Sequence, residues 1–284
     1  MKQLAILGGT SLGPTALPRK GAGWPVYGEK EIQAVQEVVK SGMWGTGGPK
    51  QVELEEAFAA YCDARYGIMM TYDEELYERL YSTKFCGRGR VAGAGWPTMQ
   101  SGNFRSNEFA ATLGLCQLRH LTEQNLKRRE NGMYLEDMLQ QEIPGFTNLY
   151  RDERVTFQTY YRLSFRYNKD YWDGISRQAV INVVKAEMDG TLKVMPSYDP
   201  LSHSPLYQPN SKRTHYLSEE YWKAIDPSRF RLPVIEKMWK EEASNFDHCA
   251  LLADKSEMDK IVDAFKKVYR NLNELKAYDA TLQL

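Results

Sequence analysis

The chain has 284 residues, of which 42% are hydrophobic and 26% charged, the proportions of an ordinary globular protein with one large or two modest domains. Lysine plus arginine and aspartate plus glutamate both number 37, so no overall charge favours nucleic acid or an anionic membrane as partner. No run of roughly 18 apolar residues occurs, and the cysteines show no C-x-x-C spacing, which argues against a transmembrane helix, a metal site and a disulfide framework. Reduced cysteines are typical of a cytoplasmic protein, the location we expect.

The chain begins with an arm, residues 1–28, that is rich in glycine and proline and predicts irregular structure. Gly8-Gly9-Thr10 invites comparison with a phosphate-binding loop. A small nucleotide-binding module, however, needs a glycine-rich turn directly after a strand, and no such turn is present. We therefore give this alternative little weight.

Two amphipathic helices are predicted after the arm, over Glu29–Lys40 and Pro49–Tyr61. Ser41-Gly42 ends the first. Met69–Tyr72 is strand-like, and Asp73 is placed to cap a third helix that reaches Ser82.

A glycine-rich loop is predicted over Gly87–Gly102. Ser106 or Asn107 then begins a long helix that extends to Arg129 or Gln141.

Beyond Pro144-Gly145, strand and helix patterns alternate. This alternation predicts a small α/β layer on an antiparallel or mixed sheet. Its predicted elements are a strand at Tyr160–Tyr167, a helix at Arg177–Met188, a helix at Leu232–Ser244, a strand at Cys249–Leu252 and a helix at Glu257–Leu275.

Two blocks carry recognisable motifs: Gly23-Trp24-Pro25-Val26-Tyr27-Gly28 with Ser41-Gly42-Met43-Trp44-Gly45-Thr46-Gly47, and Gly102-Asn103-Phe104-Arg105 with the helix after it. Both blocks resemble the DegT/DnrJ/EryC1/StrS family of pyridoxal-phosphate (PLP) enzymes, which aminate nucleotide-linked keto-sugars and keto-cyclitols. Within that family the chain is most similar to the scyllo-inosose aminotransferases.

The resemblance implies an α/β fold made of a remnant of the large domain of a fold type I PLP-dependent transferase and a small C-terminal α/β domain. The first would occupy residues 1–143, with a junction near residues 68/69, and the second residues 144–284. Only about 35 residues separate Tyr66 from Gly102. A family member has far more there, so roughly 100 residues, about a domain's worth, are skipped.

PLP transamination needs a lysine for the Schiff base and an acid on the pyridinium nitrogen. In the resembled family both lie in the segment that is skipped here. We therefore expect no catalytic residue in this chain and no PLP held as an internal aldimine. Lys84 is the candidate substitute, but we expect a solvated lysine there.

The motifs that remain would serve cofactor and substrate binding. By the resemblance, Asn103 would reach across a dimer to the partner's PLP phosphate, with Arg105 supporting it. The alternative is a loop-capping asparagine followed by a surface arginine.

Substrate contacts are implied for Trp44 and Thr46, beside the substrate entrance, and for His203 and Tyr207, in a loop that contacts sugar or cyclitol. The alternatives are a glycine-rich turn closed by an aromatic ring at Trp44, and an unpartnered loop histidine at His203.

Three interpretations of function follow. The first is an internally deleted aminotransferase, inactive in this form, whose family substrates are a keto-sugar or keto-cyclitol with glutamine or glutamate as donor. The second is a non-catalytic subunit that pairs with a complete homologue. The third is an active PLP enzyme with an unrecognised lysine. We expect a homodimer or association with a full-length homologue.

Overall fold

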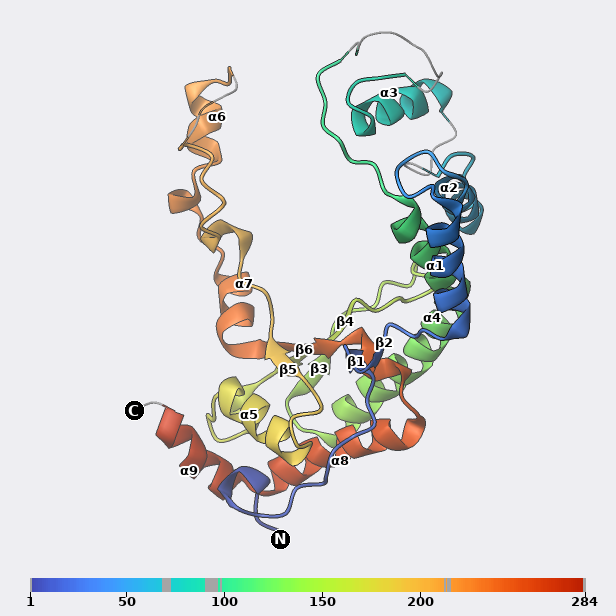
Figure 1. Cartoon of the computed structure of the whole chain (residues 1–284). Coiled ribbons are helices and arrows are strands. Elements are labelled where there is room, and N and C mark those ends of the chain that lie inside the picture. The colour runs from blue at the N-terminus through green and yellow to red at the C-terminus, as the bar shows by residue number, and fades with distance from the viewer. Residues whose placement is uncertain are drawn as a thin grey trace. The chain divides into compact units, whose positions relative to one another are not determined.

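The computed structural model describes residues 2–67, 73–89, 97, 99–211, 213 and 216–282 (Figure 1). It divides into two compact units: a sheet unit, made of Met1–Gly23 with Asn125–Leu284, and a helical unit, Trp24–Gln124. The division falls inside helix α4 (Glu108–Glu142). The predicted domain limits, 1–143 and 144–284, stay a prediction. The predicted strand Met69–Tyr72, the junction at 68/69 and part of the predicted loop 87–102 lie outside the described residues.

The sheet unit contains an antiparallel sheet of order β3-β4-β6-β5, formed by Phe146–Asn148, Arg162–Tyr167, Ala243–Asp247 and Val194–Pro196. The predicted strand at 160–167 is confirmed, beginning at Arg162. Successive side chains of a strand point to opposite faces, so Leu163, Phe165 and Tyr167 are all buried on one face. All three strand pairings in this sheet are antiparallel, so the antiparallel alternative is the correct one.

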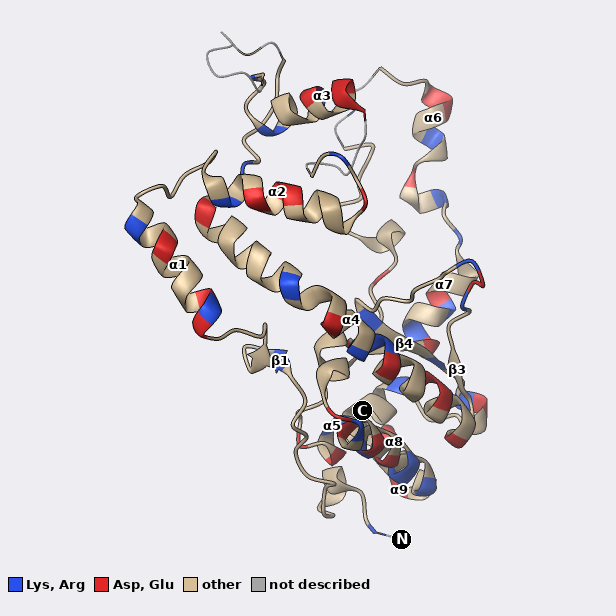
Figure 2. Ribbon diagram, turned by 90° about the vertical axis from the view of Figure 1, so that its right-hand side faces the viewer, with Lys and Arg blue, Asp and Glu red and all other residues tan. Residues whose placement is uncertain are grey.

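Helices α5 (Arg177–Glu187), α8 (Lys255–Arg270) and α9 (Leu272–Leu282) accompany the sheet in this unit. On α8, buried residues recur at the spacing of one helical face. They are Met258, Ile261, Val262, Phe265 and Val268. Lysine, arginine, aspartate and glutamate are interspersed on the helices (Figure 2), in keeping with the balanced composition.

Two predicted elements near the C-terminus are wrong. The helix predicted over Leu232–Ser244 is a short helix α7 (Pro233–Lys237) and a π-helical turn, Met238–Glu242, after which β6 begins. The strand predicted at 249–252 is instead part of a 3-10 turn, His248–Leu252. The reason is that β6 lies between β4 and β5, so both of its edges are hydrogen-bonded and pairing outweighs local helix preference.

The N-terminal arm is also more ordered than predicted. It forms a 3-10 turn at Ala5–Leu7 and buries Leu4 completely. The amide of Leu4 donates to Glu274 Oε2 at 2.8 Å, and that of Ala5 donates to Glu187 Oε1 at 2.9 Å. The arm is thus part of the sheet unit's core. Two-residue strands, β1 (Arg19–Lys20) and β2 (Gly23–Trp24), follow it.

The helical unit consists of α1 (Glu29–Ser41), α2 (Pro49–Tyr61), α3 (Glu74–Lys84) and the first half of α4. The four predicted helices are confirmed. Asp73 caps α3 by accepting the amide of Leu76 at 3.0 Å. Asn107 caps α4 in the same way, through the amide of Ala110 at 2.8 Å. Within its described residues this unit has no strand longer than two residues.

Among the described residues, no helix combines the length and apolarity needed to cross a bilayer. The remaining short helix, α6 (Glu219–Ala224), belongs to the sheet unit.

Candidate functional site

Asn103 and Arg105 lie against the C-terminal end of α3. Asn103 forms a β-bridge with Phe85, and its side-chain oxygen accepts from Arg105 Nε at 2.8 Å. The Arg105 guanidinium lies over the Phe85 ring, 4.5 Å from its centre. The structure therefore brings together the two residues that the sequence assigns to cofactor binding, and Asn103 is exposed.

Lys84 lies in the same neighbourhood, and its predicted solvation is wrong. Its side chain is only 15% exposed, and Nζ forms an ion pair with Glu55 of α2. It also lies 5.1 Å from the centre of the Tyr81 ring. A half-buried lysine needs such a counter-charge, because desolvation without a partner is costly.

Trp44 and Thr46 lie in the loop between α1 and α2, and both are exposed. The indole Nε1 of Trp44 donates to the carbonyls of Val38 and Val39, at 3.1 and 3.2 Å. Trp44 therefore caps the end of α1, as expected for a turn closed by an aromatic ring.

The buried Glu108 fixes the start of α2. Its carboxylate accepts from the amides of Lys50 and Gln51, both at 2.9 Å. A Cβ on Gly48 would lie 2.3 Å from the carboxyl carbon of Glu108, so glycine is required for this approach. The anion-binding position at this helix N-terminus is thus filled by the protein itself. The sequence contains no signal that pairs these distant residues.

Replacing Glu108 by alanine is expected to lower the free energy of unfolding by about 2 kcal/mol, because two amides lose their acceptor in a buried position. Urea denaturation followed by far-UV circular dichroism would measure it. The control is Glu56→Ala on the exposed face of α2, expected to change stability by less than about 0.5 kcal/mol. Equal effects of both substitutions would contradict this role.

In the sheet unit, a cavity of about 700 Å³ lies between residues 197–207 and 230–235. Tyr207 lines it and stacks on Phe230 with 6.2 Å between ring centres. The Tyr207 hydroxyl donates to the carbonyl of Ile225 at 3.1 Å. Aromatic walls with few polar groups are typical of a small-molecule site.

His203 lies beside this cavity. Its Nε2 is 3.9 Å from Glu236 Oε1, and its ring contacts Trp239 edge-on at 5.2 Å. The alternative of an unpartnered loop histidine is therefore wrong. Trp239 in turn donates to Asp199 Oδ1 at 2.7 Å, and Asp199 lines the cavity.

Asp199, Tyr198 and Phe230 were not predicted as site residues. A carboxylate and hydroxyl beside apolar walls can bind the hydroxyls of a sugar or cyclitol. Asp199 and Tyr198 carried a sequence signal, since they lie a few residues before His203 in the chain.

The described residues do not fit an anchored PLP. Lys84, the lysine considered for a Schiff base, is engaged by Glu55. The amides at the start of α2 are engaged by Glu108. Over the described part of the chain, no group of three or more His, Cys, Asp or Glu side chains could hold a metal ion.

Comparison with known proteins agrees with the motifs. The model of the DegT/DnrJ/EryC1/StrS aminotransferase family matches residues 25–71 and 66–248. The chain is 33% identical over 220 residues to an L-glutamine:2-deoxy-scyllo-inosose aminotransferase of Streptoalloteichus tenebrarius, covering 74% of this chain and 51% of the relative. It is 30% identical over 242 residues to the enzyme of that name from Streptomyces paromomycinus, covering 82% and 55%.

The fold is similar to that of 3-amino-5-hydroxybenzoic acid synthase, with a TM-score of 0.70 and 14% identity, over 89% of this chain and 98% of that chain. It is also similar to DesI solved with its TDP-sugar product, with a TM-score of 0.52 and 18% identity, over 74% of this chain and 46% of that chain. These likenesses confirm the predicted fold class. The chain spans about half the length of the curated relatives that it matches.

Proposed function

Because this chain belongs to the DegT/DnrJ/EryC1/StrS aminotransferase family, we propose that it is a shortened relative of the keto-cyclitol and keto-sugar aminotransferases that does not form the lysine–PLP Schiff base. The names of its relatives, which specify L-glutamine and scyllo-inosose derivatives, support the substrate class. We also propose that the chain is located in the cytoplasm. It would form a homodimer or a complex with a complete homologue.

The observation that carries this proposal is the environment of Lys84. Its Nζ is paired with Glu55 in a unit whose described residues form no strand longer than two residues. A Schiff-base lysine must instead present an unencumbered amine to the cofactor aldehyde. The two segments that match the family model, 25–71 and 66–248, overlap at residues 66–71, which supports an internal deletion at the predicted junction.

Borohydride reduction tests the proposal. The purified chain is incubated with PLP, reduced, digested and mapped by mass spectrometry, with a complete relative as positive control. We expect no lysine of this chain to carry stoichiometric pyridoxyl label, because Lys84, the lysine considered for the Schiff base, is already paired with Glu55. Stoichiometric label on Lys84, or on any other single lysine, would overturn the proposal and favour the active-enzyme interpretation.

A non-catalytic partner subunit is the second candidate. The exposed Asn103 and the cavity beside Tyr207 favour it, because both are available to a second chain or a substrate. To distinguish this candidate from the first, the chain is mixed with a complete homologue and their co-elution is measured by size-exclusion chromatography.

A further inference from the structure

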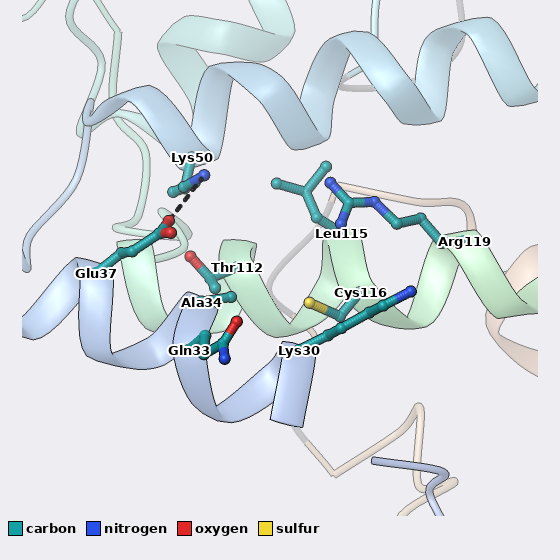
Figure 3. Close-up of a pocket in the computed structure, with 9 residues that line it drawn as sticks. All are labelled: Lys30, Gln33, Ala34, Glu37, Lys50, Thr112, Leu115, Cys116 and Arg119. Atoms are coloured by element: carbon teal, nitrogen blue, oxygen red, sulfur yellow. Dashed lines mark ion pairs between the residues drawn. The ribbon is translucent and has the colours of Figure 1, made fainter. Parts of the chain in front are cut away.

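A second cavity, of about 290 Å³, lies within the helical unit between α1, the start of α2 and α4 (Figure 3). It is separate from Asn103 and Arg105, neither of which lines it. Its floor is buried and comes from α4: Thr112, Leu115 and Cys116. The surrounding wall carries three cations, Lys30, Lys50 and Arg119.

The cations are not fully compensated. Lys50 Nζ is 3.3 Å from Glu53 and 3.9 Å from Glu37, and Arg119 is 3.7 Å from Glu53. Lys30 has no ion pair with any described residue. Lys50 and Arg119 thus share two carboxylates while Lys30 has none among the described residues, and Glu37 is the one acid among the residues that line the cavity. The neighbouring Glu31 is already held by the Gly28 amide at 2.7 Å and by His120 at 3.5 Å.

Thr112 supplies an independent observation. Its side chain is 2% exposed, and its hydroxyl oxygen has no hydrogen-bond partner among the residues that the structure describes. Figure 3 shows this oxygen on the side of α4 that faces Lys50 and Glu37. A buried hydroxyl without a partner costs free energy, so such a group at the floor of a cavity indicates a missing ligand.

Cys116, the other polar side chain of the cavity floor, carries no negative charge that would repel an anion. Burial raises the pKa of the Cys116 thiol, so Cys116 is neutral at physiological pH and adds no negative charge. The floor therefore offers a hydroxyl donor, and the wall offers ammonium and guanidinium donors.

We propose that this cavity binds a small oxyanion, a carboxylate or a phosphate, with the Thr112 hydroxyl and the Arg119 guanidinium as its main donors. Lys30 and Lys50 supply the remaining positive charge. The volume admits the anionic group together with a few further atoms, so the ligand is a small metabolite and not a nucleotide. This site is independent of the proposed function, because it does not involve Lys84 or PLP.

Isothermal titration calorimetry of the full chain tests the proposal, with inorganic phosphate in one arm and glutarate in the other. We expect one of the two to bind with a dissociation constant at or below about 1 mM, a modest affinity for a small ligand. The arm that binds identifies the source of the oxyanion. Absence of binding in both arms up to about 10 mM overturns the proposal.

Variants locate the binding. Thr112→Val and Arg119→Gln are each expected to weaken it by about tenfold, the loss of one charge-assisted hydrogen bond. Thr112→Ser keeps the hydroxyl and should bind within about twofold of the unmodified chain. The control is Lys40→Gln, which removes an exposed cation of α1 outside the cavity.

Two results would contradict the assignment. One is binding by Thr112→Val at full strength, because the hydroxyl would then not be a donor to the ligand. Far-UV circular dichroism establishes that this variant is folded. The other is a loss in Lys40→Gln equal to that in Arg119→Gln, which would indicate attraction by overall charge and not by a site.

Discussion

Turnover of a keto-cyclitol with glutamine is expected to be no faster with the purified chain than with free PLP. Enzymes commonly accelerate reactions by about a millionfold or more, and in PLP enzymes the lysine and the ring-nitrogen acid are essential to that factor. In this chain Lys84, the lysine considered for the Schiff base, is paired with Glu55. The whole acceleration should therefore be missing.

The measurement is the rate of amine formation by the chain with added PLP, beside the Streptoalloteichus tenebrarius relative as positive control. Turnover above the free-PLP rate that disappears in Lys84→Ala, while Lys40→Ala keeps it, would refute the prediction. Lys40 is a suitable matched control because it is exposed at the end of α1.

The second large effect concerns the core of the sheet unit, where Trp172 is fully buried. Its ring lies 4.9 Å from that of Tyr269 and 5.3 Å from that of Tyr167. Its Nε1 donates to the carbonyl of Pro144 at 2.8 Å. Trp172→Ala would leave both a cavity and an unsatisfied carbonyl.

We expect this substitution to cost about 3–5 kcal/mol of unfolding free energy, a large part of the roughly 5–15 kcal/mol typical of a folded domain. Urea denaturation followed by far-UV circular dichroism measures the loss. The adjacent Tyr171 is 58% exposed, so Tyr171→Ala is the matched control and should cost under about 1 kcal/mol. A similar cost for both would mean that Trp172 does not organise the core.

The sequence by itself determined the elements with strong local signals. Helices α1 and α2 follow from apolar periodicity, and Ser41-Gly42 ends α1. The starts of α3 and α4 follow from the capping side chains of Asp73 and Asn107. These signals act within one or two turns, so they are legible without tertiary contacts. The motifs around Trp44 and Asn103 likewise identified the family.

Tertiary structure decided whatever depends on residues far apart in the chain. Residues 243–247 became a strand because β4 and β5 pair with both edges, although the predicted helix Leu232–Ser244 included its first two residues. Lys84 is partly buried because it pairs with Glu55, which lies 29 positions away in the sequence. Glu108 caps a helix that begins 59 positions before it. Tertiary packing determines these partners. A buried charge or amide needs an ion-pair or hydrogen-bond partner, and that partner can come from any part of the chain.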